Sequence, residues 1–83
     1  MNVERKVRSK RIDVEMHAVL TTSDGYSFDV AVRDLSADGF RIELDEEVLV
    51  GEPVSLRVGS KGTFAAEIKW ALGREAGGRF LPD

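Results

Sequence analysis

Residues 26–44 read YSFDVAVRDLSADGFRIEL, and this segment contains two runs in which apolar and polar residues alternate. Alternation with a period of two is typical of a β-strand that has one buried face and one exposed face. The first run extends from Tyr26 to Val32 and the second from Phe40 to Leu44, with a polar interruption between them. The pattern therefore predicts two antiparallel strands joined by a polar turn.

The same alternation continues on both sides of this segment. Upstream, Asp24-Gly25 supplies a turn that tolerates a positive φ, and it predicts a hairpin with the preceding strand. The predicted strands lie at residues 14–21, 26–32, 40–44, 54–58, 64–70 and 78–81. Six short strands with frequent turns predict an all-β fold, a closed six-stranded antiparallel β-barrel. Their phase places four aromatic side chains on the inward face, those of Phe28, Phe40, Phe64 and Trp70.

Length and composition limit the kind of protein this chain can be. Its 83 residues have room for one domain. The chain has no cysteine, and a small domain that folds without disulfides fits a reducing cytoplasm. No apolar run approaches the roughly 20 residues needed to span a bilayer, and the N-terminal residues lack an apolar signal segment. We therefore expect a cytoplasmic protein that does not insert into a membrane.

The charged residues are divided unevenly along the chain. Five basic residues and one acidic residue give residues 1–11 a charge of +4, and the basic ones are Arg5, Lys6, Arg8, Lys10 and Arg11. Since the whole chain carries −3, residues 12–83 carry −7. We expect a flexible basic arm at residues 1–12 and a barrel at residues 13–83, without a C-terminal helix. A short basic arm on an acidic body suits a small anionic ligand better than long nucleic acid.

Few residues show the pattern of a catalytic or metal site. The single imidazole, His17, lies among the exposed positions of its strand without a neighbour that would orient it, so we interpret it as a surface histidine. The acidic run Asp45-Glu46-Glu47 lacks the alternating ligands and internal glycine of a calcium loop, and we interpret it as a solvated loop. We therefore predict that the protein is not an enzyme and holds no metal or cofactor.

The polar interruption between the two central strands has groups that suit a nucleotide. Asp34 and Ser36 are two residues apart, so on extended backbone their side chains lie on one face. Such a pair can accept hydrogen bonds from the N1–H and amine edge of a guanine, while guanidinium groups bind phosphate and stack on the base. Gly39 permits a chain reversal or a close approach of the ligand. Structural alternatives stay open: Asp34 and Ser36 only cap their own turn, the arm is a solvated tail, and Trp70 is a core residue.

Along nearly its whole length the chain resembles a PilZ domain. The resemblance rests on the basic arm, on the turn Asp34-x-Ser36-x-x-Gly39, and on a late strand at residues 66–70 that is followed by Gly77-Gly78-Arg79-Phe80. It implies a six-stranded barrel that binds cyclic di-GMP, with an Arg-x-x-x-Arg arm that folds over the ligand.

The arm departs from the pattern of the PilZ family at one position. Arg11 matches the second arginine of the arm motif, whereas Val7 stands where the first is expected, between Lys6 and Arg8. The resemblance implies a main set of ligand-binding residues, Arg8, Arg11, Asp34, Ser36 and Gly39. It implies secondary candidates as well, namely Arg5, Lys6, Lys10 and Trp70.

The resemblance implies a cyclic di-GMP receptor that signals to an effector protein. Many relatives carry a C-terminal helix that can mediate a dimer, but because we expect no C-terminal helix here, we expect a monomer. Two alternatives stay open. One is a degenerate PilZ domain that does not bind the nucleotide and acts as a protein-protein interaction adaptor. The other is an OB-like binder of single-stranded nucleic acid, which should show exposed aromatic residues among lysines on one sheet face. The predicted inward phase of the aromatic residues disfavours this second alternative.

Overall fold

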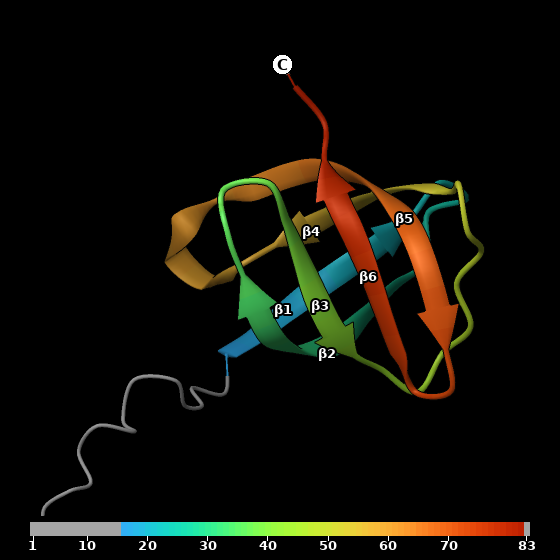
Figure 1. Ribbon diagram of the computed structural model, residues 1–83. Coiled ribbons are helices and arrows are strands. Elements are labelled where there is room, and N and C mark those ends of the chain that lie inside the picture. The colour runs from blue at the N-terminus through green and yellow to red at the C-terminus, as the bar shows by residue number, and fades with distance from the viewer. Residues whose placement is uncertain (1–15, 83) are drawn as a thin grey trace, which may run out of the picture.

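The strands of the computed structural model, which describes residues 16–82, close into a barrel (Figure 1). They are β1 (Met16–Thr22), β2 (Ser27–Leu35), β3 (Gly39–Glu43), β4 (Pro53–Arg57), β5 (Thr63–Leu72) and β6 (Glu75–Phe80). Every neighbouring pair is antiparallel in the order β1-β2-β3-β6-β5-β4, and β4 pairs back onto β1. A 3₁₀ turn, η2 (Gly59–Lys61), joins β4 to β5. The predicted six-stranded antiparallel barrel is confirmed.

The hairpin predicted at Asp24-Gly25 is also confirmed. β1 and β2 pair in a register that sets Leu20 opposite Phe28. Gly25 adopts a φ of 94°, which favours glycine, and the Thr22 amide donates to the Tyr26 carbonyl at 2.8 Å. Within residues 16–82 there is no helix of the length and apolar character needed to cross a bilayer.

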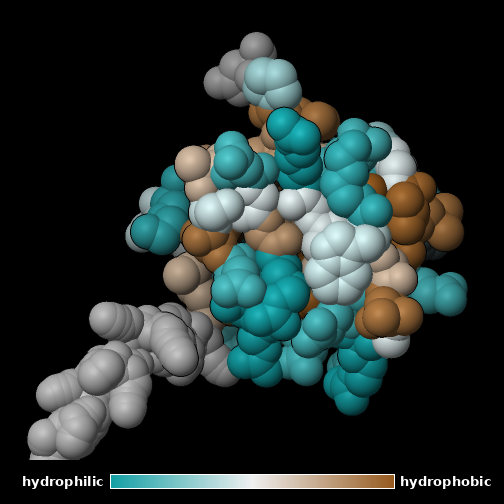
Figure 2. Space-filling model, in the orientation of Figure 1, coloured by the Kyte–Doolittle hydropathy of each residue, from teal (hydrophilic) through white to brown (hydrophobic). Residues whose placement is uncertain are grey.

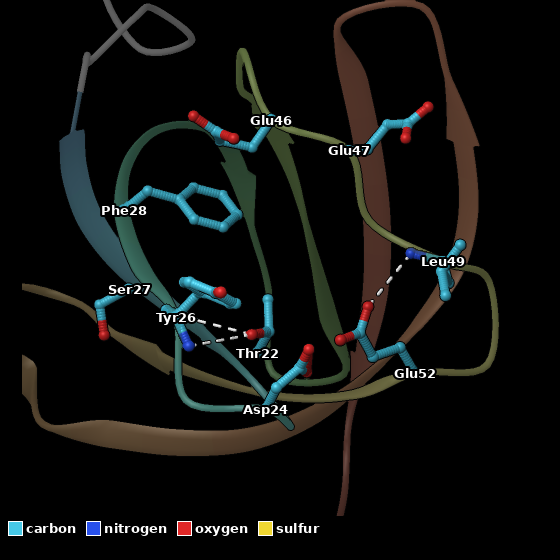
Figure 3. A pocket seen from close by; sticks show the side chains of 9 residues that line it. All are labelled: Thr22, Asp24, Tyr26, Ser27, Phe28, Glu46, Glu47, Leu49 and Glu52. Carbon is cyan, nitrogen blue, oxygen red and sulfur yellow. Dashed lines mark hydrogen bonds between the residues drawn. The ribbon is translucent and has the colours of Figure 1, made fainter.

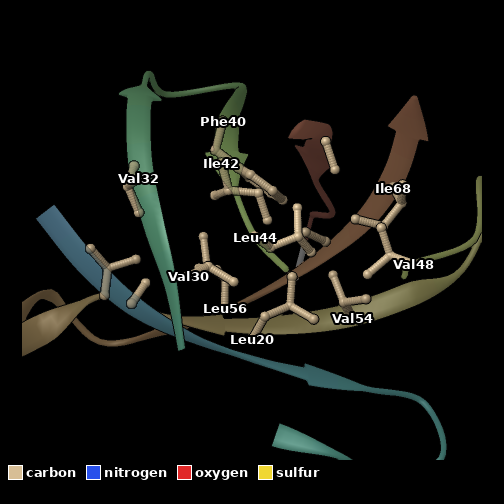
Figure 4. Close-up of a cluster of buried hydrophobic side chains, with 14 residues drawn as sticks. Leu20, Val30, Val32, Phe40, Ile42, Leu44, Val48, Val54, Leu56 and Ile68 are labelled. Atoms are coloured by element: carbon tan, nitrogen blue, oxygen red, sulfur yellow. The ribbon is translucent and has the colours of Figure 1, made fainter. Parts of the chain in front are cut away.

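The alternating apolar residues meet inside the barrel (Figure 4). Leu20, Ile42, Leu56 and Ile68 are fully buried, and no charged or polar residue is buried within residues 16–82. The rest of the core consists of Ala18, Val30, Val32, Phe40, Leu44, Val48, Val54, Val58, Ala66 and Ala76. Each strand therefore contributes its inward phase to one core, which is the driving force that closes the sheet.

The last strand begins earlier than the alternation predicted. β6 starts at Glu75 rather than at Gly78, and it pairs with β3 through Ala76 and Gly77. Alternation does not reveal the start of β6, because alanine and two glycines give almost no contrast between an apolar and a polar face. β2 likewise continues to Leu35, into the segment predicted as a turn.

One of the four aromatic residues predicted to face inward does not. Phe28 packs against the core, Phe40 belongs to it and Phe64 lies opposite the fully buried Leu56, but Trp70 is 39% exposed. The β5–β6 register shifts between Ile68 and Trp70, and such a bulge adds a residue that changes the face on which the following side chain lies. Phe64, at the start of β5, remains 38% exposed and contacts Phe80, which packs against the core, with ring centroids 5.5 Å apart.

Candidate functional site

The turn between β2 and β3 is closed by Ser36. Its amide donates to the Gly39 carbonyl at 2.9 Å, and its hydroxyl oxygen accepts from the Gly39 amide at 3.2 Å and from the Asp38 amide at 3.3 Å. These bonds fix the turn next to Asp34. Ser36 therefore caps its own turn, as one structural alternative expected, whereas the Asp34 side chain bonds to Arg41 and not to the turn.

Gly39 is needed because two strands approach closely, and not because of an unusual backbone conformation. It is absent from the glycines with positive φ, which are Gly25, Gly51, Gly59, Gly62 and Gly73. A Cβ atom at Gly39 would lie 2.3 Å from the Gly78 carbonyl oxygen of β6. We expected Gly39 to permit a chain reversal or a close approach of the ligand; in the structure its missing side chain permits the close approach of β3 to β6.

Asp34 is held by an arginine of the neighbouring strand. Arg41 Nε donates to Asp34 Oδ2 at 2.8 Å, and Arg41 Nη1 donates to Glu75 Oε2 at 3.2 Å. The hydrogen bond to Asp34, helped by the negative charges of Asp34 and Glu75, raises the pKa of Arg41 above its ordinary value. The Asp34 side chain remains 66% exposed, so its carboxylate is accessible to a ligand.

Asp34 and Arg41 belong to a row of four residues that crosses four adjacent strands. Asp34 pairs with Arg41, Arg41 pairs with Gly77, and Gly77 pairs with Trp70. A Cβ atom at Gly77 would lie 2.1 Å from Trp70 Nε1, so the indole ring lies over this glycine. A Cβ atom at Gly78 would instead meet the core residue Phe40. Gly77 therefore faces outward, and we call Asp34, Arg41, Gly77 and Trp70 the outer row.

A second arginine lies on the same face. Arg79 follows Gly77 by two residues in β6, so its side chain also points outward, and it pairs in register with Gly39 and Glu67. It is exposed and makes no ion pair with any residue of the described part of the chain. Figure 2 looks onto this side of the barrel and shows hydrophilic side chains over β3 beside paler ones over β6.

The outer row offers three kinds of contact within a short span. Neighbouring strands lie about 4.8 Å apart, so three spacings separate Asp34 from Trp70 by about 14 Å of sheet. Over that span the row presents a carboxylate, a guanidinium and an indole ring. A carboxylate accepts hydrogen bonds from a purine edge, a guanidinium binds phosphate, and an indole stacks on a base.

The residues predicted from the sequence fall into two groups. Asp34, Ser36 and Gly39 meet at one turn, and Trp70 joins Asp34 through the outer row. The predicted arm residues Arg5, Lys6, Arg8, Lys10 and Arg11, and also Val7, lie outside the described residues.

Sequence reasoning missed Arg41, Arg79 and the seat that Gly77 provides for Trp70. Alternation beyond Gly39 would have placed Arg41 outward, across a short turn from Asp34. The bulge in β5, which has no sequence signal of its own, hid the relation between Trp70 and Gly77.

The residues interpreted as unrelated to chemistry lie on the surface. His17 is exposed on β1, and Asp45 pairs with Arg74 in the loop after β3. Within residues 16–82 no three side chains of the kinds that bind metals are grouped closely enough to hold an ion.

Comparison with known protein families identifies the family of this chain. A family model described as the PilZ domain matches residues 5–82. The match includes the turn between β2 and β3, all six strands and most of the basic arm. No curated protein was found to be similar to the chain.

Proposed function

Because the chain belongs to the PilZ domain family, which is generally associated with cyclic di-GMP binding, we propose that it is a cyclic di-GMP receptor. The ligand binds across the outer row and under the basic arm, and the bound state signals to a partner protein. PilZ domains are binding modules and not catalysts. The observation that carries the proposal is the outer row, which aligns Asp34, Arg41 and Trp70 on one face of the barrel.

Each side chain of the row has a role in this proposal. The Asp34 carboxylate accepts from the N1–H and the exocyclic amine of one guanine. Trp70, whose ring is exposed above Gly77, stacks on a base. The guanidinium groups of Arg41 and Arg79 neutralise phosphate, and the arm residues Arg8 and Arg11 close over the ligand.

The barrel itself supplies two arginines near the proposed ligand, which is relevant to the missing arm arginine at Val7. The arm offers one arginine fewer at the family's motif positions, but Arg41 and Arg79 supply guanidinium groups from strands of the barrel. Stacking is worth about 1 to 3 kcal/mol per base, and a hydrogen bond to a charged group about 1.5 to 3 kcal/mol. After the cost of ordering the arm, several such contacts give about −8 kcal/mol, which corresponds to micromolar affinity.

The experiment that tests the proposal is a calorimetric titration of the full chain with cyclic di-GMP. Saturable heat with a micromolar midpoint is the expected result, and cyclic di-AMP is the control because adenine lacks the N1–H donor and the amine at C2. Absence of heat at high micromolar ligand would contradict the receptor proposal and favour the adaptor alternative.

Trp70→Leu is expected to weaken binding of cyclic di-GMP by about 5-fold to 100-fold because the stacking surface is lost. The barrel should remain folded, since the indole lies outside the core. Calorimetry measures the affinity and circular dichroism the fold. Leu72→Ala, another exposed residue of β5, is the matched control and should bind like the parent chain. Equal affinities of the Trp70 variant and the parent would remove Trp70 from the site.

Val7→Arg is expected to strengthen binding about tenfold, because it restores the first arginine of the arm motif and adds one charge-assisted hydrogen bond. The same titration measures this gain. Val3→Arg places an equal charge elsewhere on the arm and serves as control for a general electrostatic effect. If both variants gain equally, the position of the arm arginine has no specific role.

A further inference from the structure

A hollow of about 490 Å³ lies at the end of the barrel opposite the β2–β3 turn. It is formed by the β1–β2 turn and by the loop between β3 and β4 (Figure 3). Glu46 and Glu47 lie along one side of the open centre, with Asp24 and Glu52 across from them. We call this hollow the acidic groove, and its walls also include Tyr26 and Leu49.

The walls of the acidic groove combine apolar side chains with carboxylates that form no ion pair with a basic residue within residues 16–82. Tyr26 and Leu49 are each 69% exposed, and both line the same hollow, so together they form an exposed apolar surface there. Asp24, Glu46 and Glu47 make no ion pair within residues 16–82. A segment that fits the acidic groove should therefore bring both apolar and basic side chains.

The chain itself contains a segment with this composition. Residues 1–11 carry a charge of +4, and their apolar residues are Met1, Val3 and Val7. Val7, which departs from the arginine of the family motif, is an apolar residue between two basic ones. We propose that residues 1–11 dock in the acidic groove of their own chain when no nucleotide is bound.

The length of the segment permits this arrangement. Along β1 the distance from Met16 to Thr21, beside the acidic groove, is about 17 Å at 3.3 Å per residue. The seven residue-to-residue steps from Ser9 to Met16 span up to about 24 Å when extended. The part of the arm from Ser9 toward Met1 therefore reaches the acidic groove after the chain turns back along the barrel. Docking within one chain also benefits from a high effective concentration.

Docking in the acidic groove would give the nucleotide a way to change the surface of the protein. Arm residues seated in the acidic groove beside Ser27 and Phe28, at the start of β2, cannot at the same time close over a ligand at Asp34, near the other end of β2. Binding of cyclic di-GMP thus exposes Tyr26 and Leu49 to a partner. This release step rests on the proposed function, whereas docking in the absence of nucleotide does not.

Disulfide cross-linking tests the docking directly, since the chain has no natural cysteine. In the full chain, Ser9→Cys is combined with Ser27→Cys, because Ser27 lines the hollow. The control pair combines Ser9→Cys with Ser60→Cys in η2, which follows β4 toward the Met16 end of β1 and so lies nearer to the start of the arm. The Ser27 pair should form an intramolecular disulfide at least about fivefold faster than the control pair.

Charge variants show whether the groove attracts the arm. Glu46→Lys with Glu47→Lys should abolish the preference for Ser27, whereas Asp29→Lys with Glu67→Lys, an equal charge change elsewhere, should preserve it. Equal rates for Ser27 and Ser60, or disulfides formed only between two chains, would overturn the proposal. Cyclic di-GMP should slow the Ser27 cross-link. If cross-linking is selective but the nucleotide has no effect, docking stands and the proposed function fails.

Discussion

Gly39→Ala is expected to lower the free energy of unfolding by about 2 to 3 kcal/mol, the upper range for overpacked sites. The Cβ atom would lie 2.3 Å from the Gly78 carbonyl oxygen, which is backbone and cannot rotate away. β3 and β6 would have to separate along the ladder that closes the barrel. For a domain of this size the midpoint of thermal unfolding should fall by roughly 10 to 20 °C, as measured by circular dichroism.

Ala37→Val is the matched control for this variant. It adds carbon atoms to an exposed residue of the same turn, and the unfolding midpoint should change by no more than about 3 °C. A Gly39→Ala protein as stable as its parent would show that the strands do not approach as described. Loss of ligand binding in a Gly39 variant would thus report a damaged fold, and not a lost contact.

Asp34→Ala is expected to weaken cyclic di-GMP binding by about 10-fold to 100-fold, because it removes hydrogen bonds between a carboxylate and the guanine edge. Stability should change little, since the Asp34–Arg41 ion pair is solvent-exposed and such pairs contribute at most about 1 kcal/mol. Calorimetry of the folded variant measures the loss. This separation of binding from stability is the opposite of the result expected for Gly39.

Asp29→Ala controls for the removal of one negative charge. Asp29 is an exposed carboxylate of β2 that lies toward the other end of the strand. Its variant should bind cyclic di-GMP with the affinity of the parent. If Asp34→Ala binds within threefold of the parent, or if both variants lose affinity equally, Asp34 has no direct contact with the ligand.

The barrel architecture could be predicted from the sequence because the alternation of apolar and polar residues shows which side chains of each strand face the core. Leu20, Ile42, Leu56 and Ile68 lie in the inward phase of their strands, and all four are fully buried. The alternation failed where side chains carry little contrast, as at the start of β6, and where a bulge shifted the register before Trp70. Bulges depend on pairing between strands distant in sequence, so a single strand does not reveal them.

The turn that forms one part of the candidate site could be predicted from the sequence, but the outer row could not. Asp34 and Ser36 are close in sequence, so their spacing alone placed them together. The outer row joins Asp34 to Trp70 through two intervening strands, and that contact depends on the closed order of the barrel. Alternation places Arg41 on the outward face of β3, but its contact with Glu75 depends on the position of β3 beside β6 and cannot be predicted from one strand.

The measurement that tests the central claim most directly is ¹⁵N–¹H shift mapping of the full chain during titration with cyclic di-GMP. The account predicts saturable shifts of the amides of Asp34, Arg41 and Gly77, together with the indole Nε1–H of Trp70. Amides of the residues around Ser60 should not move. Absence of shifts at high micromolar ligand, or shifts that leave all four of these groups unchanged, would contradict the claim that the outer row binds the nucleotide.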